Sequence, residues 1–128
     1  MPQRDAIQTS GAPAAIGPYV QAIRTGDLLF CSGQIPLDPS TGELIDGDAA
    51  AQAQRCLTSL EAVAAAAGGS LKDAVKCTIY LTDLADFAAV NAVYETFMGD
   101  PAPARVTVQV AALPKGADVE IDAIVALA

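Results

Sequence analysis

Ala74-Val75-Lys76-Cys77-Thr78-Ile79-Tyr80-Leu81-Thr82 alternates apolar and polar side chains along its whole length. A period of two predicts a β-strand with one face in the core and the other outside it. The residues predicted to face the core are Val75, Cys77, Ile79 and Leu81. The same period recurs in 104–110 and 118–125, where Val106, Val108 and Val110, and then Val119, Ile121, Ala123 and Val125, form wholly apolar faces.

Around these three strands the chain carries two further strands and two helices. Residues 20–25 and 28–34 predict strands joined by a tight turn at Gly26-Asp27. Asp48 is a plausible N-cap for a helix to about Ala67, which Gly68-Gly69 would end. The second helix carries its apolar stripe on Phe87, Val90, Tyr94 and Phe97, and Gly99 and Pro101 end it.

The predicted order ββαβαββ indicates a single α+β domain over residues 1–128, a two-layer sandwich of a mixed sheet with both helices on one face. The helices should cover the apolar face of each late strand. The opposite face of the sheet mixes Thr78, Tyr80, Arg105, Thr107, Glu120 and Ile124. Because no further layer remains to cover this half-apolar face, we expect a homo-oligomer that packs sheet against sheet.

Composition removes several classes of function. The 128 residues contain no histidine and 7 Lys+Arg against 15 Asp+Glu, for a net charge of −8. Histidine triads and histidine-ligated metals are therefore excluded, and we expect no metal and no nucleic-acid partner. The three cysteines form no CxxC pair, and no run is long enough to span a bilayer. Without a recognisable secretion signal, we expect a cytoplasmic protein with reduced thiols and no membrane partner.

Arg105 and Glu120 are the sharpest candidates for chemistry, predicted to share the face of the sheet away from the helices. A guanidinium suits a substrate carboxylate, and a carboxylate can activate water or pass a proton. From the pattern alone, a cross-strand ion pair is the favoured interpretation.

Four other positions are individually unremarkable. Tyr19 follows a proline and is typical of packing, and Ser32-Gly33 reads as an ordinary strand exit or bulge. Asn91 lies within the second helix, where a solvated polar position is the default interpretation. No glycine-rich phosphate-binding pattern occurs, so nothing supports a nucleotide ligand.

Taken together, four motifs give a resemblance over essentially the whole chain. These are Ala12-Pro13-Ala14-Ala15-Ile16-Gly17-Pro18-Tyr19-Val20-Gln21, Ser32-Gly33-Gln34-Ile35-Pro36, Pro103-Ala104-Arg105 and Val119-Glu120-Ile121. In these motifs the sequence resembles the RidA (YjgF, L-PSP) family.

The resemblance implies a chorismate-mutase-like fold and a homotrimer with active sites between subunits. It also implies hydrolysis of reactive enamines and imines, such as 2-aminoacrylate/2-iminopropanoate and 2-iminobutanoate, to 2-oxo acids and ammonia without a cofactor. By position, Arg105 matches the arginine that grips the substrate carboxylate, and Glu120 the glutamate that positions water. Tyr19 matches the tyrosine of the cleft, and Ser32 and Gly33 match the pocket lining. Asn91 falls on a recurring position with no assigned role.

Two departures and three alternatives accompany the resemblance. Thr107, a substrate-binding position by the resemblance, stands where many members have cysteine, so that no thiol-dependent role carries over and only backbone contacts remain. Ala102 stands where an aromatic residue often occurs. Some relatives are named endoribonuclease or translation inhibitor, which the charge and the missing histidine disfavour. A small-ligand sensor and a chaperone-like holdase are non-enzymatic alternatives within the same family.

Overall fold

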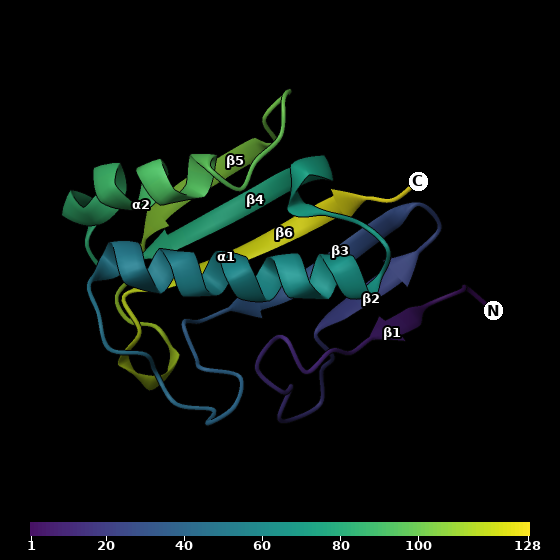
Figure 1. Ribbon diagram of the computed structural model, residues 1–128, viewed down its shortest axis with the longest axis horizontal. Coiled ribbons are helices and arrows are strands. Elements are labelled where there is room, and N and C mark those ends of the chain that lie inside the picture. Colours follow the sequence, from purple (N-terminus) through teal and green to yellow (C-terminus); the bar gives the residue numbers. More distant parts are fainter.

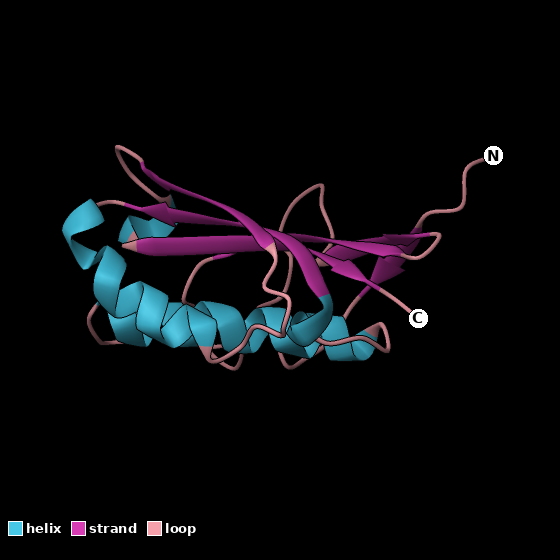
Figure 2. Ribbon diagram, turned by 90° about the horizontal axis from the view of Figure 1, so that it is seen from above, coloured by secondary structure: helices cyan, strands magenta, loops and turns pink.

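Six strands form one sheet, and two helices lie on one of its faces, as a computed structural model of all 128 residues describes (Figures 1 and 2). The strands stand in the order β1-β2-β3-β6-β4-β5, and only β4 and β5 run parallel. Their bounds are Asp5–Ile7 for β1, Ala22–Thr25 for β2, Leu28–Gln34 for β3, Ala74–Leu81 for β4, Ala104–Gln109 for β5 and Val119–Ala126 for β6. The helices are α1, Ala49–Ala66, and α2, Phe87–Glu95. The predicted two-layer α+β sandwich is confirmed.

Local signals place the first helix and the hairpin where the sequence predicts them. Asp48 caps α1 by accepting a hydrogen bond of 2.9 Å from the backbone N–H of Ala51. The helix ends before Gly68, whose φ of 83° lies in the left-handed region. Gly26, at φ 57°, forms the two-residue turn that pairs Thr25 of β2 with Leu28 of β3. Only the short edge strand β1 was not predicted.

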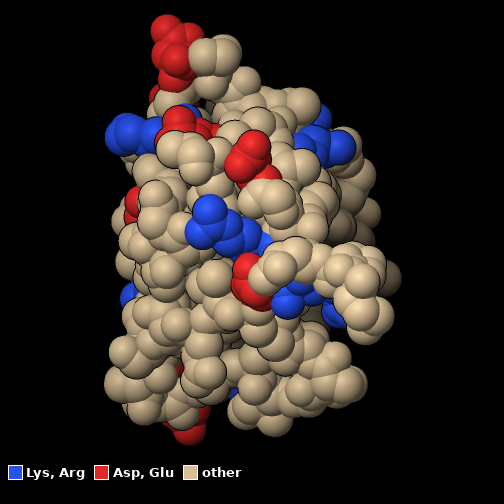
Figure 3. All heavy atoms as spheres, turned by 90° about the vertical axis from the view of Figure 1, so that its right-hand side faces the viewer, with Lys and Arg blue, Asp and Glu red and all other residues tan.

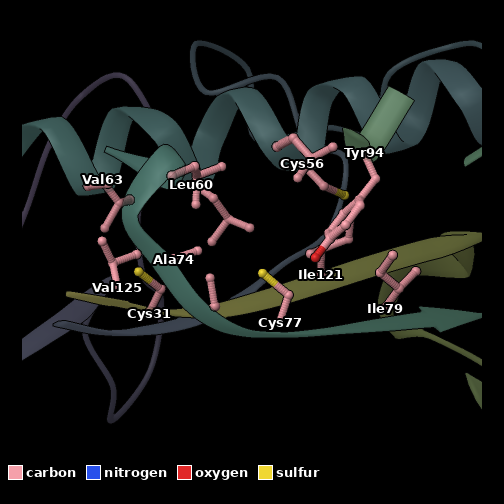
Figure 4. Close-up of a cluster of buried hydrophobic side chains, with 14 of the residues drawn as sticks. Cys31, Cys56, Leu60, Val63, Ala74, Cys77, Ile79, Tyr94, Ile121 and Val125 are labelled. Carbon is pink, nitrogen blue, oxygen red and sulfur yellow. The ribbon is translucent and has the colours of Figure 1, made fainter. Parts of the chain in front are cut away.

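The core lies between α1 and the central strands β4 and β6. The apolar stripe of α1 packs on the buried face of β6, and Tyr94 reaches down from α2 toward the sheet (Figure 4). All three cysteines are buried and unpaired, and Cys77 faces the core as predicted. Burial raises the pKa of Cys31 to about 12, so that its thiol stays protonated at neutral pH. Neither helix has the length and hydrophobicity that crossing a bilayer requires.

One residue of β4 departs from the predicted face. The pairing of β4 with β6 shifts register between Ala74 and Lys76. This bulge turns Val75 outward, where it is 44% exposed, and puts Ala74 into the core. The prediction for Val75 is therefore wrong, and that for Cys77, Ile79 and Leu81 is confirmed.

The face prediction for β5 is also wrong. The parallel register sets Arg105 beside Cys77 and Thr107 beside Ile79, and both partners on β4 are fully buried beneath the helices. Arg105 and Thr107 therefore point to the helix side, and Val106 and Val108 point to the open face of the sheet, where they are 43% and 37% exposed. An edge strand whose residues alternate strictly can turn either face toward the helices. The register of β5 with β4 decides which of its faces lies on the helix side.

Candidate active site

Arg105, at the start of β5, is held by α2. Its Nη1 donates a hydrogen bond of 2.6 Å to Oδ1 of Asn91. The guanidinium carbon lies 5.3 Å from the ring centre of Phe87 and 5.0 Å from that of Tyr94. Positions 87, 91 and 94 are four and three residues apart, which places all three side chains on one face of the helix. We call Arg105, Asn91, Thr107 and the two rings the arginine half-site.

Thr107 follows two residues after Arg105 on the same face of β5. Its Oγ1 is buried and has no hydrogen-bond partner, and the same holds for the hydroxyl of Tyr94. Burial raises the pKa of Tyr94, which keeps this hydroxyl neutral. The arginine half-site therefore presents one cation among neutral groups.

Glu120 lies on β6, on the other face of the sheet, and packs against Gly33. The bulge between Cys31 and Gln34 brings Gly33 so close that a Cβ atom there would collide with the Glu120 carboxylate. Burial, and secondarily the Asp122 carboxylate two residues along, raises the pKa of Glu120. Asp122 accepts hydrogen bonds of 3.1 Å from the backbone N–H of Thr78 and from the Tyr80 hydroxyl.

Tyr19 and Ser32 stand on the same side of the molecule as Glu120. The Ser32 hydroxyl donates a 2.6 Å hydrogen bond to the Val20 carbonyl and so ties the end of β3 to the segment that carries Tyr19. Tyr19, 53% exposed, lines three clefts. One of them, of about 450 Å³, also includes Ser32 and Phe30, and another, of about 660 Å³, includes Gly33. We call Glu120, Gly33, Ser32 and Tyr19 the carboxylate half-site.

The predicted site residues thus fall into two groups on opposite faces of one sheet. Arg105 and Glu120 do not share a face, which corrects the sequence interpretation. They form no ion pair either, because Arg105 bonds to Asn91 and β4 separates the two strands. No cluster of three or more Cys, Asp or Glu side chains is arranged to hold a metal.

Sequence reasoning missed Phe87 and Tyr94 as partners of Arg105 and assigned them only to the core stripe. Their helical spacing to Asn91 could have grouped the three, but nothing local relates α2 to β5. Tyr80 and Asp122 were likewise not singled out, because their pairing depends on the register between β4 and β6.

The sequence and the fold both match known proteins. A family model described as endoribonuclease L-PSP matches residues 9–127. A RutC family protein of Sinorhizobium fredii is 55% identical over 121 residues, covering 94% of this chain and 96% of that protein. A protein of Escherichia coli named 2-iminobutanoate/2-iminopropanoate deaminase is 50% identical, covering 92% and 94%. The crystal structure of RidA from a Psychrobacter species superposes with a TM-score of 0.92 at 49% identity, covering 97% and 100%. The chain belongs to the RidA (YjgF, L-PSP) family.

Proposed function

We propose that this protein hydrolyses the imine tautomers of reactive enamines, such as 2-iminopropanoate and 2-iminobutanoate, to 2-oxo acids and ammonia. The observation that carries the proposal is the division of the site. A cation held by neutral groups suits the substrate carboxylate, and a half-buried carboxylate of raised pKa suits water and proton transfer. The name of the Escherichia coli relative supports the same reaction.

The two half-sites would meet between subunits. One chain cannot place its own Arg105 and Glu120 on one small molecule, because the sheet lies between them. Its open face exposes large apolar side chains on two strands, Leu28 and Phe30 on β3 and Val106 and Val108 on β5. Exposed apolar side chains on an uncovered sheet face fit a second copy of the same chain. We therefore propose a homotrimer in which Arg105 of one subunit faces Glu120 of the next.

The chemistry needs no nucleophile from the protein and no cofactor. Arg105 would hold the carboxylate, and Tyr19, Ser32, Gly33 and Thr107 would line the pocket. Glu120 would orient a water whose oxygen adds to the imine carbon, and it would pass a proton to the nitrogen. Glu120 would then carry the hydroxyl proton of the resulting carbinolamine to its amino nitrogen. The C–N bond breaks, the nitrogen leaves with the electron pair as ammonia, and the carbon–oxygen double bond forms. Holding one water against an electrophilic carbon lowers the entropic part of the barrier.

The test is a coupled assay in which a threonine dehydratase releases 2-aminocrotonate, the enamine tautomer of 2-iminobutanoate, and the appearance of 2-oxobutanoate is followed. We expect the protein to accelerate this step, and Arg105→Ala and Glu120→Gln to abolish the acceleration. Lys72→Ala, which removes a cation at an exposed position that lines neither half-site nor the clefts beside Tyr19, serves as the matched control and should remain active. No acceleration by the wild-type protein, or full activity of Arg105→Ala, would refute the proposal.

Cleavage of RNA, which the family description suggests, is not favoured. The net charge of −8 opposes approach to a polyanion, and the chain lacks histidine for acid–base cleavage. On the face seen in Figure 3, Lys and Arg are interspersed with Asp and Glu and form no continuous basic patch. Three unpaired buried cysteines support a reducing compartment, and we propose the cytoplasm as the location.

A further inference from the structure

Arg105, the arginine proposed to bind an anion, donates its hydrogen bond within the chain to a neutral amide oxygen and not to a carboxylate. Arginine Nη atoms are most strongly held by carboxylates, and this chain has more than twice as many Asp and Glu as Lys and Arg. The acceptor at 2.6 Å is nevertheless the only asparagine in the sequence. No carboxylate forms an ion pair with Arg105.

The other contacts of the guanidinium are also uncharged. Two aromatic rings, Phe87 and Tyr94, lie within 5.3 Å of its central carbon. Such rings attract a cation through their quadrupole and leave its net charge intact. Tyr94 is only 5% exposed, so the surrounding core fixes the position of this ring beside the guanidinium.

The geometry also leaves donors free. An arginine carries five N–H donors, and only one hydrogen bond from this side chain is formed within the chain. The residue itself is exposed. The guanidinium is therefore anchored at one nitrogen while other N–H groups remain open to a planar, bidentate anion.

From these contacts we propose that Asn91 is a positioning residue, whose neutral amide oxygen orients Arg105 without cancelling the charge of the guanidinium. We call the three uncharged side chains that hold Arg105, namely Asn91, Phe87 and Tyr94, the neutral clamp. The inference rests on the proposed function, since it makes the clamp part of the recognition of an α-imino acid carboxylate.

The proposal predicts an order of activities that a purely structural role would reverse. In Asn91→Asp, the carboxylate keeps the hydrogen bond and adds an ion pair, so Arg105 stays in place but loses its unpaired charge. In Asn91→Ala, the hydrogen bond is lost, but the charge and both rings remain. If Asn91 only stabilised the fold, aspartate would serve at least as well as alanine.

We expect the KM of Asn91→Asp to rise at least tenfold with little change in kcat, and its Tm to stay at or above that of the wild type. Asn91→Ala should raise KM about threefold. Ala92→Asp adds the same charge at the next, exposed position of α2 and should leave KM near that of the wild type. Activity of Asn91→Asp equal to or above that of Asn91→Ala would overturn the proposal, as would an effect confined to kcat.

Binding of pyruvate by calorimetry separates this inference from the proposed function. If the wild type binds pyruvate without hydrolysing imines, the proposed reaction fails, and the same order of variants in Kd decides for or against the clamp. If the wild type does neither, both proposals are overturned.

Discussion

Adding a single methyl group at Gly33 should lower the activity strongly while lowering the stability only slightly. Its backbone is not in the left-handed region, so that alanine adds no conformational strain there. The three atoms nearest to the added Cβ all belong to the Glu120 side chain, including Cδ at 3.1 Å. Because that carboxylate ends a flexible side chain, it can rotate away at a cost of about 0.5–1.5 kcal/mol.

We therefore expect Gly33→Ala to lower the free energy of unfolding by no more than about 1.5 kcal/mol. The displaced carboxylate no longer orients the attacking water, and a shift of about 1 Å can cost on the order of 10²-fold in rate. Urea denaturation measures the first quantity, and kcat/KM in the dehydratase-coupled assay measures the second.

A double-mutant cycle with Glu120→Ala tests the cause. The three atoms nearest to the added Cβ all belong to Glu120, so in the Glu120→Ala background Gly33→Ala should cost less free energy of unfolding than in the wild type. Gly99→Ala is the matched control. Its Cβ would meet the backbone carbonyl of Lys72, which cannot rotate away, so it should lose more stability while activity per folded molecule stays near wild type. Independent, additive effects of the substitutions at 33 and 120 on the free energy of unfolding would refute the reasoning.

Three further predictions follow from burial and charge. Because burial favours the neutral acid, folded Glu120 keeps its proton above its ordinary pKa of 4.5, and its contribution to stability falls as pH rises through the raised pKa. The kcat/KM of the wild type should rise between pH 4.5 and this raised pKa, and a flat profile there would contradict the role of the carboxylate. Phe30→Glu puts a charge on the open face, where the side chain is 41% exposed, and should lower the mass seen by analytical ultracentrifugation; an unchanged assembly would exclude this face as the interface. Leu57→Ala empties a fully buried site on α1 and should cost about 2–5 kcal/mol in urea denaturation, and a loss below 1 kcal/mol would show that the core repacks.

Much of the fold was predictable because its signals are local. The Asp48 cap, the Gly26-Asp27 turn and the apolar stripe of α1 each depend on residues within a few positions of one another. The same holds for the alternation of β6, where Val119, Ile121, Ala123 and Val125 are all buried. The bulge at Val75 was not predictable, because it is a property of the pairing between β4 and β6 and not of either strand.

The sequence by itself determined which residues could do chemistry here. With no histidine, an arginine and a glutamate in recognisable motifs were the natural candidates. Only the tertiary structure decided where they point. Alternation divides a strand into two faces but does not say which face is inner, and a shift of one residue exchanges them. The register of β5 against buried Cys77 and Ile79 turned Arg105 toward α2, while Glu120 stayed on the open face. This placement of the two side chains on opposite faces is set by packing between strands far apart in sequence, and it divides the site into two half-sites.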